Sequence, residues 1–249
     1  MPVGKNLGKV NMKRKIYDKL LQWKNEKDGT TALMIEGARR IGKSYIAERF
    51  AEKEYESYIL IDFSKAPARV RGWFDEYLED IDTLLQNIQL HYKKKLTPRK
   101  SLIIFDEVQK CPRAREAIKA LVEDHRFDYI ETGSLISIKK NVDDILIPSE
   151  EDGIEMYPMD FEEFMWAMGD EVMYPYIRKC FDTNKPMGDF HREAMRYFRQ
   201  YLIVGGMPQA VKEYVNSKDF NKVDAIKRQI LRLYRNDIKK YAGSAKTKV

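Results

Sequence analysis

The segment at positions 37–44, Gly-Ala-Arg-Arg-Ile-Gly-Lys-Ser, matches the phosphate-binding pattern GxxxxGK[ST]. Its two glycines let the backbone curl so that N–H groups face phosphate oxygens, and a helix beginning near Lys43 would add its positive end. Lys43 can then reach the β- and γ-phosphates, and the Ser44 hydroxyl can ligate Mg²⁺. The alternative is a glycine turn with an incidental lysine. We predict that the nucleotide is bound by the whole segment: Gly37, Ala38, Arg39, Arg40, Ile41, Gly42, Lys43 and Ser44.

An apolar run, Leu102–Phe105, ends in two carboxylates, Asp106 and Glu107. Alone, such a run is typical of any strand that leads into a surface loop. Beside a phosphate loop, Asp106 would hold Mg²⁺ through water, and Glu107 would orient or deprotonate the attacking water. We therefore predict Ser44 and Asp106 as metal ligands and Glu107 and Lys43 as catalytic residues. The glutamate after the aspartate favours an ATPase of the additional-strand class, and the sequence has no guanine-reading Asn/Thr-Lys-x-Asp motif.

Two hydroxyl residues, Thr132 and Ser134, follow another short apolar run. In a sheet of parallel strands, the carboxyl ends of the strands carry the ligand site. We predict that one of these side chains contacts the γ-phosphate or the attacking water. An ordinary turn at the end of a strand is the alternative.

The elements that must position these residues can be predicted from hydrophobic spacing. Short apolar runs predict strands at 32–35, 58–61, 102–105 and 127–131, and helical spacing occurs at 14–23, 43–55, 73–92 and 114–123. Strands that alternate with helices predict an α/β domain, here a P-loop NTPase fold on a mainly parallel sheet.

The pattern changes after Pro148. Residues 153–157 fit one more short strand, and segments 161–168, 191–203, 208–214 and 224–241 have helical spacing. We predict a tail and helix over 1–30, a P-loop ATPase core over 31–168, and a helical subdomain, open to a winged-helix arrangement, over 169–249.

Composition bounds the class of protein. The 249 residues contain 45 Lys plus Arg against 39 Asp plus Glu, and 43% are hydrophobic, which argues against a disordered chain. No apolar run approaches the ~20 residues of a membrane helix, and no signal peptide is evident, so we predict a cytoplasmic protein without a membrane partner. The net charge of +6 gives little support to a nucleic-acid partner.

The motifs GARRIGKS, LIIFDEVQ, ETGS, YPMDFEEF and GGMP occur in this order. Their combination resembles the prokaryotic P-loop ATPases of the AAA-domain family related to archaeal and STAND ATPases, over roughly residues 12–241. The resemblance implies that ATP and Mg²⁺ bind at residues 37–44 with Asp106, and that Glu107 is the catalytic acid. It also implies a first sensor at Thr132 or Ser134. Pro208, in the GGMP segment, would lie near the adenine, unless the segment is only a turn between helices.

The chain departs from this family at two places. Relatives often carry a Gly-Arg pair before the Tyr-Pro segment, where this chain has Ser-Glu-Glu-Asp-Gly at 149–153, so a sensing arginine there is in doubt. Arg113 and Arg115 are among the candidate arginine fingers. Relatives also usually continue into a C-terminal domain of uncertain function with a nuclease-like fold. This chain stops at Val249, so we expect that domain to be missing.

The function favoured by the sequence is a Mg²⁺-dependent ATPase that couples hydrolysis to a conformational change. Two alternatives share the same motifs: a slow nucleotide-dependent regulatory switch, and a DNA-associated ATPase. A homo-oligomer or a protein partner is left open.

Overall fold

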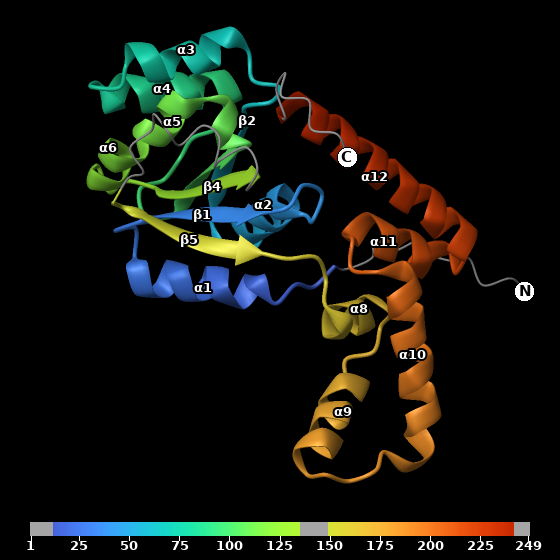
Figure 1. Ribbon diagram of the computed structural model, residues 1–249. Helices are drawn as coiled ribbons and strands as arrows, with labels where there is room; N and C mark the ends of the chain where they lie inside the picture. The colour runs from blue at the N-terminus through green and yellow to red at the C-terminus, as the bar shows by residue number, and fades with distance from the viewer. Residues whose placement is uncertain (1–11, 135–148, 242–249) are drawn as a thin grey trace, which may run out of the picture. The chain divides into compact units, whose positions relative to one another are not determined.

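The computed structural model describes residues 12–134 and 149–241 (Figure 1). It forms two compact units, and each is described here by itself. The first unit comprises residues 16–157, and the described residues of the second are 12–15 and 158–241. Within the described ranges, no helix is both long and apolar enough to cross a membrane.

A five-stranded parallel sheet forms the centre of the first unit. Its strands lie in the order β2 (Ser57–Asp62), β3 (Ser101–Asp106), β4 (Asp128–Ser134), β1 (Ala32–Gly37) and β5 (Glu151–Met156). Every residue of β3 and β4 is buried, as expected of parallel strands covered on both faces. The predicted α/β fold on a parallel sheet is thus confirmed.

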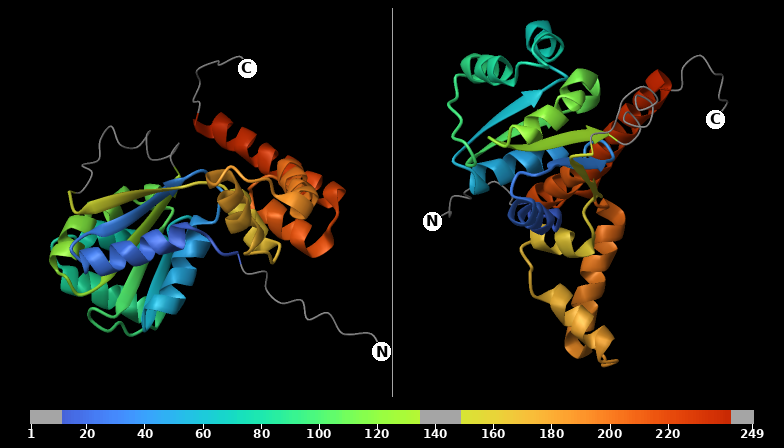
Figure 2. Two further views of the ribbon diagram at one scale, coloured as in Figure 1. Left: turned by 90° about the horizontal axis from the view of Figure 1, so that it is seen from below. Right: turned by 90° about the vertical axis from the view of Figure 1, so that its left-hand side faces the viewer.

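Helices cover both faces of this sheet. Helices α1 (Ile16–Lys27) and α2 (Lys43–Glu54) lie side by side over one face, as the left view of Figure 2 shows. The other face is covered by α3 (Ala68–Glu76), α4 (Ile81–Tyr92), α5 (Pro112–Glu116) and α6 (Ile118–Glu123) (Figure 1). Three phenylalanines, Phe63, Phe74 and Phe105, meet in the core of this second face with ring centroids 5.5–5.6 Å apart.

Two helices predicted from spacing are in fact divided. The pattern over 73–92 belongs to α3 and α4, because Asp80 accepts a hydrogen bond from the Thr83 N–H and starts a new helix. The pattern over 114–123 belongs to α5 and α6, which are divided at Ala117. Side-chain spacing alone does not report such breaks, since the apolar residues on both sides of each break face the same core.

The second unit is helical. It contains α8 (Phe161–Ala167), α9 (Met173–Asp182), α10 (His191–Val204), α11 (Pro208–Ser217) and α12 (Phe220–Tyr241), with a 3₁₀ turn at Gly188–Phe190. Asp160 and Glu163 form a capping box at the start of α8. Helix α9 was not predicted from the sequence. The described chain divides into its two units at 157/158. Helix α8 belongs to the second unit, where Phe164 stacks on Tyr214 of α11. The domain bounds expected from the sequence stay a prediction.

Candidate functional site

The phosphate loop connects β1 to α2, and its first glycine is sterically required. Gly37 has φ +147°, and a Cβ built on it would lie 2.3 Å from the carbonyl oxygen of Met156 in the neighbouring strand β5. Gly42, with φ +97°, makes the left-handed turn that starts α2. Only glycine adopts these backbone conformations without strain, so the sequence requires both glycines to form the loop.

The N-terminal end of α2 favours an anion. Its first turn has no acidic residue, and no side chain caps it, so its first N–H groups keep their partial positive charge. The Lys43 amine donates to the carbonyls of Gly37 at 3.0 Å and Ala38 at 2.8 Å, across the loop. Burial lowers the pKa of Lys43, while the negative charges of Glu107 and Asp106 act in the opposite direction.

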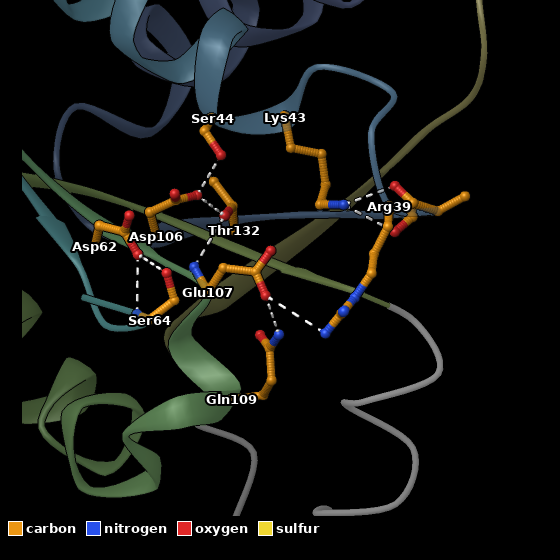
Figure 3. A network of polar contacts seen from close by, with 11 residues as sticks. Arg39, Lys43, Ser44, Asp62, Ser64, Asp106, Glu107, Gln109 and Thr132 are labelled. Carbon is orange, nitrogen blue, oxygen red and sulfur yellow. Dashed lines mark hydrogen bonds and ion pairs between the residues drawn. The ribbon is translucent and has the colours of Figure 1, made fainter. Parts of the chain in front are cut away.

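Three oxygen-bearing side chains meet at the ends of β3, β4 and the start of α2 (Figure 3). The Ser44 hydroxyl donates to Oδ1 of Asp106 at 2.6 Å, and the buried Thr132 hydroxyl donates to the same oxygen. Hydroxyl and carboxylate oxygens are the ligands that a hard cation such as Mg²⁺ prefers. The structure thus brings together Ser44 and Asp106, the two residues predicted as metal ligands.

Glu107 lies at the edge of this cluster. Its backbone is left-handed (φ +57°), and its N–H donates to the Thr132 hydroxyl at 3.3 Å. Its carboxylate Oε2 accepts a 2.6 Å hydrogen bond from Nε2 of Gln109 and lies 4.0 Å from Nη2 of Arg39 in the phosphate loop (Figure 3). The Glu107 carboxylate also lies close enough to the Lys43 amine that its negative charge acts to raise the pKa of Lys43.

The remaining predicted residues occupy three kinds of position. Ser134 is buried and pairs with Gly37 in the register of β4 and β1, so it lies beside the loop. Pro208 is the first residue of α11 in the other unit, and its adenine contact stays a prediction. Arg113 is exposed, whereas Arg115 is buried against the Glu151 carboxylate, which it meets through Nη2 at 2.7 Å and Nε at 3.1 Å. Because a finger must reach a separate nucleotide, this geometry disfavours Arg115.

The buried carboxyl of Glu131 lies near this Arg115–Glu151 pair. Glu131 is in the middle of β4, it is fully buried, and neither of its oxygens has a hydrogen-bond partner among the described residues. Burial raises the pKa of Glu131 well above its ordinary value, and the Glu151 charge raises it further, while Arg115 acts in the opposite direction. The surroundings of Glu131 thus favour the neutral form of its carboxyl.

Two motifs quoted from the sequence meet within the helical unit. The N–H of Met159, in YPMDFEEF, donates to the carbonyl of Gly206, in GGMP, at 2.7 Å. A Cβ on Gly206 would lie 2.0 Å from the Met159 carbonyl oxygen. The glycine is therefore required by a close backbone approach that fixes the start of α11.

Sequence reasoning missed two polar residues of the first unit's site. Gln109 was quoted within LIIFDEVQ but received no role, although a donor two residues after a candidate base was a usable signal. Asp62 ends β2 opposite Asp106 in the strand register. It accepts hydrogen bonds from Ser64 (Figure 3) and from the Lys65 amine. An acidic residue at the end of a second adjacent strand is the signal that could have found it.

Comparison with known proteins agrees with this architecture. Residues 29–165 match a family model described as an AAA domain. The Walker-type ATPase PABY2304 of Pyrococcus abyssi has a similar fold, with TM-score 0.55 and 16% identity over 94% of this chain and 76% of that one. PCH-2 of C. elegans matches at TM-score 0.43 and 13% identity, over 87% and 68% of the two chains, which is too distant to carry an argument. No curated protein matches the sequence.

A second family model matches the end of the chain. Residues 195–249 correspond to a domain of unknown function (DUF8612). A C-terminal domain of unknown function is thus present, which the sequence analysis did not expect. The match begins within α10 and includes α11 and α12.

Proposed function

Since the chain belongs to the AAA-domain family, we propose that it binds ATP with Mg²⁺ and hydrolyses it to ADP and phosphate. One observation carries the proposal. Ser44, Asp106, Thr132 and Glu107, which come from three separate segments of the sequence, form one hydrogen-bonded group beside the phosphate loop. A structural role alone would not require a serine, a threonine and two acids at the same edge of the sheet.

The loop fits a triphosphate. Gly37 and Gly42 allow the curled backbone of the loop, and the first turn of α2 has no acidic residue to repel an anion. Lys43 is a partly desolvated cation whose present acceptors are two loop carbonyls. A phosphate oxygen is a stronger acceptor than a carbonyl, because the resulting hydrogen bond is charge-assisted on both sides. We therefore assign ATP binding to residues 37–44.

The residues at the end of β3 fit Mg²⁺. The described chain has no group of three His, Cys, Asp or Glu side chains that could hold a metal unaided. Mg²⁺ in nucleotide sites takes one or two protein ligands and completes its sphere with phosphate and water, which suits Ser44 and Asp106. When bound, Mg²⁺ would neutralise charge that develops on the phosphates.

Glu107 is the residue to which we assign water activation. Its carboxylate lies near the Lys43 amine and is only partly buried, with 26% of the Glu107 side chain exposed. A carboxylate placed this way can orient the attacking water and accept its proton. Thr132 contacts both acidic residues, so we propose it as the sensor that connects the state of the phosphate site to β4.

The proposed function also involves the helical unit and other molecules. We propose that hydrolysis drives a conformational change in attached or partner domains, with Pro208 contacting the adenine. ATP-dependent association with a protein partner or a second copy would be one form of that change.

The test is to separate ATP binding from hydrolysis in one variant. Glu107→Gln keeps the size and hydrogen-bonding ability of the side chain but removes its charge. We expect it to bind ATP at least as tightly as the wild type, and to hydrolyse ATP at least ~100-fold more slowly in single turnover. Glu56→Gln is the matched control, because Glu56 forms an exposed ion pair with Lys100 just before β2.

Each alternative gives a distinct result in these assays. Unchanged turnover in Glu107→Gln would show that Glu107 is structural. ATP binding by a wild type that never turns over would favour the regulatory switch. Stimulation of hydrolysis by DNA, lost steeply as salt rises, would favour the DNA-associated ATPase.

A further inference from the structure

The contacts around Glu107 give a role to a residue that the motifs leave unexplained. We infer that Gln109 is a positioning residue, which holds the Glu107 carboxylate by one oxygen and so presents the other to the phosphate site. This inference rests on the proposed function. It concerns how the carboxylate is oriented, not which residue activates water.

The backbone brings Gln109 to its position. β3 ends at Asp106, and the left-handed conformation of Glu107 starts a 3₁₀ turn over Val108–Lys110. The turn is closed by a 2.9 Å hydrogen bond from the Lys110 N–H to the Glu107 carbonyl. An extended strand would carry Gln109 away from the carboxylate, whereas this turn brings its amide back beside Glu107 (Figure 3). Gln109 is only 8% exposed, so its neighbours restrict its side chain.

The contacts are unequal for the two carboxylate oxygens. Oε2 accepts the 2.6 Å hydrogen bond from Gln109 and faces Arg39 at 4.0 Å. The other oxygen points away from Gln109, toward the Lys43 side of the network (Figure 3). With Oε2 engaged, rotation of the carboxylate would break a hydrogen bond to a charged group, which is worth more than one between neutral groups. Gln109 therefore fixes the orientation of the carboxylate and leaves its other oxygen available to water.

The chemistry of the donor suits this task. An arginine or lysine at 2.6 Å would neutralise the carboxylate and weaken it as a base. A glutamine amide restrains the carboxylate with no formal charge, and Arg39 at 4.0 Å is beyond hydrogen-bond distance. The arrangement therefore keeps the negative charge of Glu107 while it restricts its orientation.

The test compares Gln109→Met in two backgrounds. Methionine matches the length of glutamine and fills the same space, but it donates no hydrogen bond. In the wild-type background we expect kcat to fall about ten- to a hundred-fold, with KM for ATP nearly unchanged. In the Glu107→Gln background, where the base is already absent, the same change should lower the residual rate less than twofold, since the two residues act as a unit.

Gln89→Met is the control for loss of a partly buried amide. Gln89 lies in α4 of the same unit, where its side chain accepts from the Leu96 N–H and donates to the Leu85 carbonyl. Its substitution should lower the melting temperature and leave kcat unchanged. A similar fall in kcat for both glutamine variants would show that Gln109 acts through stability and would overturn the inference.

The comparison of Gln109→Met in the two backgrounds also separates this inference from the proposed function. If the wild type hydrolyses ATP and Glu107→Gln does not, the proposed function stands. An equal loss of rate from Gln109→Met in both backgrounds would then overturn the positioning role alone. If the wild type does not hydrolyse ATP, the proposed function fails, and the positioning role fails with it.

Discussion

Replacing Thr132 by valine removes one hydroxyl that joins both acidic residues of the site. The hydroxyl donates to Oδ1 of Asp106 and accepts the 3.3 Å hydrogen bond from the Glu107 N–H. Valine has nearly the same shape, and Thr132 is 1% exposed, so water cannot replace the missing group. The substitution therefore isolates the loss of these two hydrogen bonds.

The magnitude follows from the two partners. Loss of a hydrogen bond to a charged group costs about 1.5–3 kcal/mol, and a partly buried N–H left without an acceptor costs about 1 kcal/mol at the low end, as suits the long 3.3 Å bond. We expect Thr132→Val to lower the free energy of unfolding by about 3 kcal/mol in the absence of nucleotide. Thr132→Ser keeps the hydroxyl and loses one methyl group, which costs about 1 kcal/mol.

The assay is urea unfolding of both variants and the wild type without nucleotide, followed by fluorescence and circular dichroism. The expected difference between Val and Ser, about 2 kcal/mol, exceeds the usual error of the extrapolation for a domain of modest stability. Equal stabilities of the Val and Ser variants, or a Val variant more stable than Ser, would refute the reasoning. In either case the hydroxyl would contribute nothing to the stability of the cluster.

Three further predictions concern the same unit. Lys43→Ala should weaken ATP binding at least a hundredfold by calorimetry while the melting temperature stays near the wild-type value, because the lysine adds a desolvated charge rather than core packing; normal affinity would exclude its phosphate contact. Ser44→Ala and Asp106→Asn should each raise the Mg²⁺ concentration needed for ATP binding, and the double variant should show less than the sum; fully additive effects would place one of them away from the metal. Glu131→Gln should stabilise the protein more at pH 8 than at pH 5. Because the folded-state pKa of Glu131 is raised, the wild type loses up to about 1.4 kcal/mol of stability per pH unit above the unfolded pKa near 4.3. Melting temperatures that change equally with pH in both proteins, from pH 5 to 8.5, would contradict a raised pKa.

The sheet and the phosphate loop were predictable because their signals are local. The run Leu102–Phe105 can be buried on both faces only within a covered parallel sheet, and the spacing of Gly37, Gly42 and Lys43 fixes a loop between a strand and a helix. The division between two helices at Asp80 was harder to predict from the sequence, since it depends on one capping hydrogen bond within a continuous apolar pattern.

The contacts of the site were only partly predictable. That Asp106 would lie near Ser44 follows from parallel topology and the motif order. That Gln109 would turn back to Glu107 depends on a left-handed residue, and glutamate gives no sign of that conformation in the sequence. The burial of the Glu131 carboxyl could not be predicted from the sequence for another reason. The strand pattern shows only one polar residue among apolar ones, and the packing around β4 is needed to show that this residue is buried.

The strand order has a consequence for synthesis on the ribosome. β1 carries the phosphate loop and is made early, yet its two sheet partners are β4 and β5, so that Leu33 pairs with Ile130 and Ala32 with Glu151. A nascent chain that ends before residue 128 has β1 but neither strand that flanks it, and Gly37 acquires Met156 as a neighbour only when β5 is complete. The nucleotide site therefore forms last within its unit, although its defining motif emerges among the first residues. Arrested chains of increasing length should gain ATP binding in a single step, once β5 has left the exit tunnel, because non-local strand pairing must be completed before the loop is held.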